Sequence, residues 1–173
     1  GIFPVYCFIP LTLNSNQSIT VSNASTTLNL YGDIDTNGKI LTFAGDGTAQ
    51  VLSYIKGAGG LSKIGNGGAN LYASNTFSGP VQINQGSINI YDASALGTTN
   101  GNTTVASNAV LSLANPITVA EPLVLSGSVN GSVAQVLSGP VTVADTNAAF
   151  RVAMGATLTI NSVISGPGGF TKN

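Results

Sequence analysis

The chain has 173 residues, 43% of them apolar, which is enough for one domain with a substantial core and excludes a compositionally disordered protein. Only 6% of the residues are charged and the net charge is −1, so the surface offers no electrostatic attraction for nucleic acid or an acidic membrane surface. Histidine is absent and Cys7 is the only cysteine, which excludes histidine-dependent triads, an internal disulfide and a cysteine zinc cluster. Ser, Thr, Asn and Gly must supply the polar surface, a composition typical of β structure with many turns.

The N-terminal segment, residues 1–13, is the first predicted element. Its apolar run is shorter than the ~20 residues of a membrane helix, and Pro4 and Pro10 would interrupt a helix, so we predict no membrane-spanning segment. One interpretation is a first strand or cap that covers the open end of the core. The other is a docking strand that completes the sheet edge of a neighbouring molecule. Its self-association segment would consist of six apolar residues: Ile2, Phe3, Val5, Tyr6, Phe8 and Ile9.

From residue 14 onward, short segments of three residues have an apolar residue at the first and third positions, which is the period of a strand with one buried face. They cover residues 19–21, 28–30, 41–43, 81–83, 88–90, 111–113, 117–119, 123–125, 141–143 and 158–160. Pairs that tolerate positive φ predict the turns between them: Asn37-Gly38, Asp46-Gly47, Asn66-Gly67, Asn100-Gly101 and Asn130-Gly131. No stretch has a 3.6-residue apolar period, so we predict an all-β chain.

Strands this short are compatible with a sandwich, an antiparallel barrel or a solenoid. Repeated turn-plus-strand units favour the solenoid: residues 38–43, 108–113 and 155–160 share one template, and residues 78–83 match residues 138–143. With roughly 20–23 residues in each coil, residues 14–173 predict a parallel β-helix of about eight coils. Ladders of Val, Ile and Leu are expected inside, and stacked Thr, Ser and Asn outside.

A glycine-rich stretch occurs twice. Residues 55–65 return as residues 164–172, shifted by 109 positions, with an apolar residue, a glycine turn, another apolar residue, a hydroxyl and a lysine in the same order. We expect both copies on the same face of the β-helix. A phosphate-binding loop would need a helix after the glycines, so we assign these glycines to turns: Gly57, Gly59, Gly60, Gly166, Gly168 and Gly169.

Residues 55–71, the stretch Ala73-Ser74-Asn75-Thr76-Phe77-Ser78-Gly79 and residues 81–90 together resemble the autotransporter-associated β-strand repeat family. The shared pattern is a glycine-rich turn, a Leu-Thr-Lys-like step, an Asn-Thr-Tyr-Ser-Gly-like step and a strand that ends in a Gly-x-Leu-like step. Residues 93–97 resemble its usual continuation and residues 152–172 begin a second copy, whereas residues 68–71 depart from the usual Thr-Leu-x-Leu strand. The resemblance implies a right-handed parallel β-helix that is exported to, or released from, a bacterial surface. It also implies a stalk without catalytic residues.

Few residues could carry chemistry. We expect turn or surface roles for Asp33 and Asp35, the alternatives being a weak calcium site with Asp46 or a catalytic pair. The equivalent residues Lys63 and Lys172 are expected to be solvated or to protect sheet edges. Core or inter-coil packing is expected for four aromatic residues, with a sugar-stacking strip as the alternative: Tyr54, Tyr72, Phe77 and Tyr91. We therefore predict no catalytic, metal-binding or cofactor-binding residue and no cofactor.

Two functions follow from these expectations. The first is a non-enzymatic structural protein of the bacterial surface or extracellular space, a stalk or fibre unit. Because the second glycine-rich copy breaks off after Lys172, we expect the β-helix to be open at its C-terminal end. Head-to-tail self-association, or further repeats of a longer chain, would cover that end. The second is an adhesin or carbohydrate-binding passenger module whose partner is a glycan or a cell surface; no nucleic-acid partner is expected.

Overall fold

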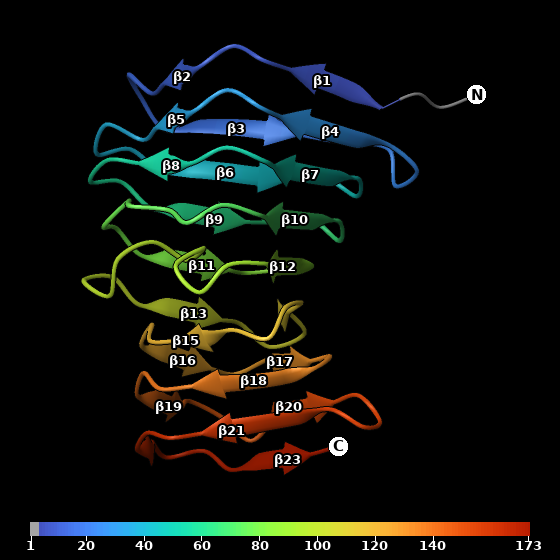
Figure 1. Ribbon diagram of the computed structural model, residues 1–173, viewed down its shortest axis with the longest axis vertical. Coiled ribbons are helices and arrows are strands. Elements are labelled where there is room, and N and C mark those ends of the chain that lie inside the picture. Colours follow the sequence, from blue (N-terminus) through green and yellow to red (C-terminus); the bar gives the residue numbers. More distant parts are fainter. Residues whose placement is uncertain (1–3) are drawn as a thin grey trace.

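The structure is a computed structural model in which residues 4–173 are described, and it has the predicted all-β, parallel solenoid architecture (Figure 1). Every strand pair between Val5 and Lys172 is parallel. The coils lie on one another along the long axis, from β1 at one end to β23 at the other, and each coil contributes a strand to each of two long sheets.

The first long sheet, sheet A, has nine strands, and the eight steps between them count about eight turns of the solenoid. One coil takes between 18 residues (Leu111 to Val129) and 24 residues (Gln17 to Leu41, in the second long sheet). In stacking order the strands of sheet A are β1 (Val5–Cys7), β4 (Thr27–Leu30), β7 (Thr48–Val51), β10 (Gly68–Leu71), β12 (Ser87–Ile90), β14 (Val110–Leu113), β17 (Ser128–Gly131), β20 (Ala148–Val152) and β23 (Phe170–Lys172).

The second long sheet, sheet C, has eight strands and forms another face of the same column. In stacking order they are β3 (Gln17–Thr20), β6 (Leu41–Ala44), β9 (Leu61–Lys63), β11 (Val81–Ile83), β13 (Thr103–Val105), β16 (Leu123–Leu125), β19 (Val141–Val143) and β22 (Ile164–Ser165).

The third face is divided into two short sheets of three strands each. Sheet B, near the N-terminal end, consists of β2 (Leu11–Thr12), β5 (Ile34–Asp35) and β8 (Ile55–Lys56). Sheet D, near the C-terminal end, consists of β15 (Thr118–Val119), β18 (Ala134–Leu137) and β21 (Thr157–Ile160). Between sheets B and D this face is formed by loops, and there the buried side chain of Asn75 bridges two coils. Its Oδ1 accepts a hydrogen bond from the Ile55 N–H at 2.7 Å, and its Nδ2 donates to the Ala95 carbonyl at 2.6 Å.

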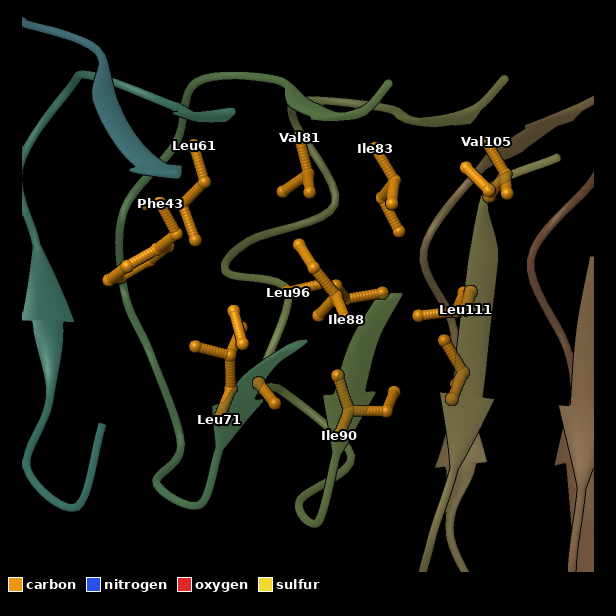
Figure 2. Packing of buried hydrophobic residues seen from close by; sticks show 14 of the residues in the cluster. Phe43, Leu61, Leu71, Val81, Ile83, Ile88, Ile90, Leu96, Val105 and Leu111 are labelled. Atoms are coloured by element: carbon orange, nitrogen blue, oxygen red, sulfur yellow. The ribbon is translucent and has the colours of Figure 1, made fainter. Parts of the chain in front are cut away.

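Aliphatic ladders fill the interior, as the strand period predicts (Figure 2). In sheet A, Ala69, Ile88 and Leu111 lie in register on consecutive strands and are fully buried. Burying an Ile or Leu side chain stabilises a fold by about 1.5–3 kcal/mol. Outside, polar side chains pair between coils: Asn89 Nδ2 donates to Asn70 Oδ1 at 2.7 Å. The predicted separation of an aliphatic inside from an amide-rich outside is confirmed.

Four of the five predicted turn pairs lie in turns or bends between strands, and the fifth prediction is wrong. Asn37 and Gly38 have φ values of 47° and 73°, as their type of pair predicts. Asn130 and Gly131 instead end strand β17, where Asn130 lies in register with Ser112 on one side and Arg151 on the other. The reason is that parallel neighbours on both sides pair with this backbone, and that pairing outweighs the local turn preference.

The two glycine-rich copies lie on different faces, so the expectation of a shared face is wrong. Ile55 pairs with Ile34 in sheet B, whereas Ile164 pairs with Val141 in sheet C. The local turn is nevertheless similar, because Gly57 and Gly166 have φ values of 99° and 114°. The number of residues in the intervening coils explains the difference. The two copies are 109 positions apart, but five coils take only 103 residues, from Leu61 to Ile164. The second copy therefore starts six residues further along its coil, on the next face.

Candidate binding groove on sheet A

The outer face of sheet A carries a column of polar side chains, one from each strand. Because parallel strands are in register, residues 18 to 23 positions apart in the sequence become close neighbours on this face. From the middle of the sheet toward its C-terminal end, the column consists of Asn70, Asn89, Ser112, Asn130 and Arg151. Arg151 is its one charged member and is exposed.

A second column stands beside the first, at the residue that follows each strand. Tyr72 and Tyr91 occupy consecutive places in it, with their rings stacked 4.2 Å apart at an interplanar angle of 16°. Partial burial, with Tyr91 adjacent, raises the pKa of the Tyr72 hydroxyl above its usual value. Further along this column the residues are small, and two of them are Ala114, after β14, and Ala153, after β20. Their backbone N–H groups donate to the carbonyl oxygens of Ile90 and Gly131 in the preceding coils.

A groove opens where the column of rings gives way to small side chains. It has a volume of about 590 Å³ and follows β12, β14, β17 and β20 on the outer face of sheet A. The Oδ1 of Asn130 is buried and has no hydrogen-bond partner among the described residues. The polar and aromatic residues of the groove wall are Asn89, Tyr91, Ser112, Asn130, Ser132, Arg151 and Asn173.

The four aromatic residues that the sequence grouped do not form one strip. Phe77 is in the core and is fully buried. Tyr54 is exposed and lies just before β8, outside the groove wall. Only Tyr72 and Tyr91 are brought together, and they pack between coils on the outer surface. Sequence reasoning missed Asn130 and Arg151, because no signal in the sequence gives the register of their coils.

Asp35 ends β5 and Asp33 lies just before that strand, whereas Asp46 lies in the turn between β6 and β7. Asp33 accepts a hydrogen bond from the Ser53 hydroxyl, and Asp35 Oδ1 accepts one from the Asn37 N–H at 2.9 Å. Asp46 Oδ1 accepts one from Asn66 Nδ2 at 3.0 Å. Between residues 4 and 173 no three carboxylate, thiol or imidazole groups come close enough to hold a metal ion.

Lys63 contradicts the expectation of a solvated side chain, because it is only 1% exposed. It lies in register with Phe43 and Ile83 on the inner side of sheet C, and its Nζ donates to the carbonyl oxygens of Ile64 at 2.8 Å and Gly65 at 2.7 Å. Burial lowers the pKa of its ammonium, and nearby Asp46 partly offsets this shift. The strand phase fixed by Leu61 outweighs the preference of lysine for water. Lys172, by contrast, is exposed.

Glu121 is a buried carboxyl that the sequence did not single out. It is 4% exposed, its Oε1 lies 3.5 Å from the Thr103 hydroxyl, and its Oε2 has no partner among residues 4–173. Burial raises the pKa of Glu121 to about 7, and the Thr103 hydroxyl opposes this shift only weakly. A carboxyl with this pKa titrates near neutral pH.

The six turn glycines differ in how closely they approach neighbouring coils. A Cβ on Gly59 would lie 1.9 Å from the Lys39 carbonyl oxygen, and one on Gly60 would lie 2.2 Å from that of Pro80. A Cβ on Gly168 would lie 2.4 Å from the Asp145 carbonyl oxygen, whereas Gly169 faces open space. Gly57 and Gly166 are the two with positive φ.

The N-terminal segment joins the solenoid as its first coil. β1 pairs with β4 and β2 pairs with β5, both in parallel. The segment also exposes large apolar side chains, and the ring of Phe8 stacks on that of Tyr31 at 4.9 Å. Ile2 and Phe3 lie outside the described residues, and the exposed members of the segment are Val5, Tyr6, Phe8 and Ile9.

Comparison of the chain with protein-family models, with curated proteins and with solved structures yields no match. Membership of the autotransporter-associated β-strand repeat family therefore stays a prediction from the motifs of residues 55–97. Across residues 4–173 the fold has no helix of the length and apolarity needed to cross a membrane.

Proposed function

We propose that the protein is a non-enzymatic structural section of a β-solenoid rod, at a bacterial surface or in the extracellular space, extended by further coils that stack on its ends. The observation that carries this proposal is a change of burial along one inward column. Val141 in β19 is fully buried, whereas Ile164, its partner in β22, is 38% exposed. An apolar residue of the inner column that meets water marks a place where another coil would add buried area.

Both ends of the solenoid present open strand edges. Among residues 4–173, β21, β22 and β23 pair on one side only, and so do β1, β2 and β3 at the other end. Unpaired N–H and C=O groups on an edge strand are a template for another strand. A second copy placed head-to-tail would set its β1, β2 and β3 against β23, β21 and β22, and would continue all three faces in parallel. This match between the two ends supports self-association into a filament.

Lys172 is the one inward charge at the C-terminal edge, since it lies in register with Phe150 on the inner side of sheet A. An inward charge can block edge pairing. Lys63 shows how this fold accommodates an inward charge where coils lie on both sides of it. Its Nζ donates to two carbonyl oxygens of the turn that follows its strand. A further coil can cover Lys172 in the same way.

Sedimentation velocity and negative-stain electron microscopy test the proposal. The purified chain is expected to assemble into rods with increasing concentration. Ile164→Glu, which places a charge at the open end, should abolish assembly, whereas Gln82→Glu, at an exposed position of β11 in the middle of sheet C, should not. A monodisperse monomer at all concentrations would reject head-to-tail stacking. If a longer form of the chain then remained monomeric with an ordered, protease-resistant stack, the covering coils would come from the same polypeptide.

Carbohydrate binding is the second candidate function, and the stacked pair of Tyr72 and Tyr91 on the outer surface favours it. Aromatic faces with adjacent amide groups can bind sugars by stacking and hydrogen bonding. A glycan array probed with the wild-type chain and with Tyr91→Ala tests this function. Signals that require Tyr91 would support an adhesin or carbohydrate-binding module.

A further inference from the structure

We propose that the groove beside Tyr91 binds an acidic oligosaccharide, with one sugar ring on the face of Tyr91 and a sugar carboxylate paired with Arg151. The inference rests on the second candidate function and specifies its ligand. It is independent of whether the solenoid assembles into rods, because the groove lies on the side of the column.

The aromatic wall has one occupied face and one open face. Tyr72, from the preceding coil, covers one face of the Tyr91 ring at a centroid distance of 4.2 Å. The following coil places Ala114 next in the column, and its methyl group leaves the other face open toward the groove. A sugar ring can take the place that a third aromatic ring would occupy, because the apolar face of a pyranose packs on an aromatic ring.

Amide groups line the floor of the groove at regular intervals. Asn89 can offer its Oδ1 to a ligand, because its Nδ2 already donates to Asn70 Oδ1 and to the Ser87 hydroxyl. Ser112 stands in register between Asn89 and Asn130 and adds a hydroxyl. Asn130 is half-buried, and its Oδ1 is enclosed without a partner among the described residues.

The charge of the groove selects an acidic sugar. Arg151 carries the one charged side chain among those that line the groove; the backbone of Asn173, the last residue of the sequence, borders the groove at its C-terminal end. Three strand steps separate Asn89 from Arg151, roughly 14 Å at about 4.8 Å per step. That span fits a short oligosaccharide rather than a single sugar. Arginine pairs with a carboxylate in a bidentate geometry, which adds specificity as well as affinity. One cation is too few for a nucleic-acid backbone.

Isothermal titration calorimetry with the purified chain is the test. The probes are tetrasaccharide fragments of polygalacturonate and of alginate, with cellotetraose as the neutral counterpart. We expect at least one acidic tetrasaccharide to bind, about tenfold or more tightly than cellotetraose. Arg151→Gln should remove that preference, and Tyr91→Ala should weaken binding of every sugar that binds. Ala114→Phe, which fills the open face of Tyr91, should abolish binding.

Matched controls are Lys56→Gln, an exposed cation on sheet B, and Tyr54→Ala, an exposed tyrosine outside the groove wall. Both should bind as the wild-type chain does, and thermal unfolding should show that all variants are folded. Equal binding of neutral and acidic probes, lost with Tyr91→Ala but unchanged in Arg151→Gln, would overturn the acidic ligand and leave the second candidate function intact. Absence of binding by all three probes at millimolar concentration, or binding unchanged in Tyr91→Ala and Ala114→Phe, would overturn the site itself. Binding to other sugars on the array would then decide the second candidate function separately.

Discussion

The side-chain oxygen of Asn75 accepts a 2.7 Å hydrogen bond from the backbone N–H of Ile55 in the preceding coil. The same side chain donates to the Ala95 carbonyl in the following coil. Asn75 therefore makes by side chain the two contacts that a strand would make by backbone. It holds the third face together where sheet B has ended and sheet D has not begun.

Asn75→Ala is expected to lower the free energy of unfolding by about 3 kcal/mol, because it leaves a buried N–H and a buried C=O without partners. Chemical denaturation followed by circular dichroism measures the loss. Asn84→Ala is the control: Asn84 is exposed and makes one 3.4 Å contact with Ser62, so its removal should be nearly neutral. Equal effects of the two substitutions would contradict the bridging role.

Glu121 should make the stability of the protein depend on pH near neutrality. Its pKa is about 7 in the folded protein against about 4.5 when unfolded, so folding favours the protonated form. The contribution is fully present below pH 4.5 and is lost as the pH rises through 7, by up to about 3 kcal/mol.

Glu121→Gln should therefore be more stable than the wild-type chain at pH 8 and similar to it at pH 4, as urea unfolding at a series of pH values would show. Asp145→Asn is the control, because a backbone hydrogen bond from Asn147 lowers the pKa of exposed Asp145 out of this window. If the wild-type chain showed no loss of stability between pH 4.5 and pH 8, the burial of Glu121 would be refuted.

Lys63 should titrate below 10.5, because burial disfavours its charged form. Above the lowered pKa the unfolded chain binds a proton that the folded chain does not, so stability should rise with pH up to 10.5. NMR titration of the side-chain methylene next to Nζ measures the pKa directly. Lys63→Met should lack the rise, and Lys56→Met, at an exposed position, should retain it. A Lys63 pKa at or above 10.5 would show that the ammonium is solvated.

Gly60 and Gly169 occupy the same place in the two sequence copies but have different surroundings. Gly60→Ala should destabilise by about 3 kcal/mol or more, because the new Cβ would lie 2.2 Å from the Pro80 carbonyl oxygen and force the coils apart. Gly169→Ala should change stability by less than about 0.5 kcal/mol, since nothing lies within 4 Å of its Cβ position. Thermal unfolding of the two variants tests this pair, and a reversed order would be inconsistent with the coil contacts described.

The strand period predicted much of the fold. All ten alternating segments fall in or overlap strands, for example residues 88–90 in β12 and residues 117–119 in β15. β7 was missed because its inward residue Ala49 is small and gives a weak apolar signal. β2, β5 and β8 are two residues long, too short to show any period. Local turn preference misplaced Asn130, since pairing with β14 and β20 decides its conformation.

The candidate groove was only partly predictable. The sequence identified Tyr72 and Tyr91 but did not join them to Asn130 or Arg151. Because the coils vary from 18 to 24 residues, the register at any strand depends on the length of every coil before it, and no local motif contains that information. The same variation explains why equivalent glycine turns occupy different faces. The prediction that the Lys63 side chain is solvated was wrong because it relied on residue type. The position of Lys63, two residues after Leu61 in the same strand, indicates the interior instead.

Backbone pairing in this column joins each coil only to the coil before it and the coil after it. Disruption can therefore spread inward from either terminus while the centre stays folded, so the end coils open at a lower free energy than the central ones. Amide protons should exchange fastest in β1–β3 and β21–β23 and slowest around β10–β13, in a profile that mirrors position along the axis.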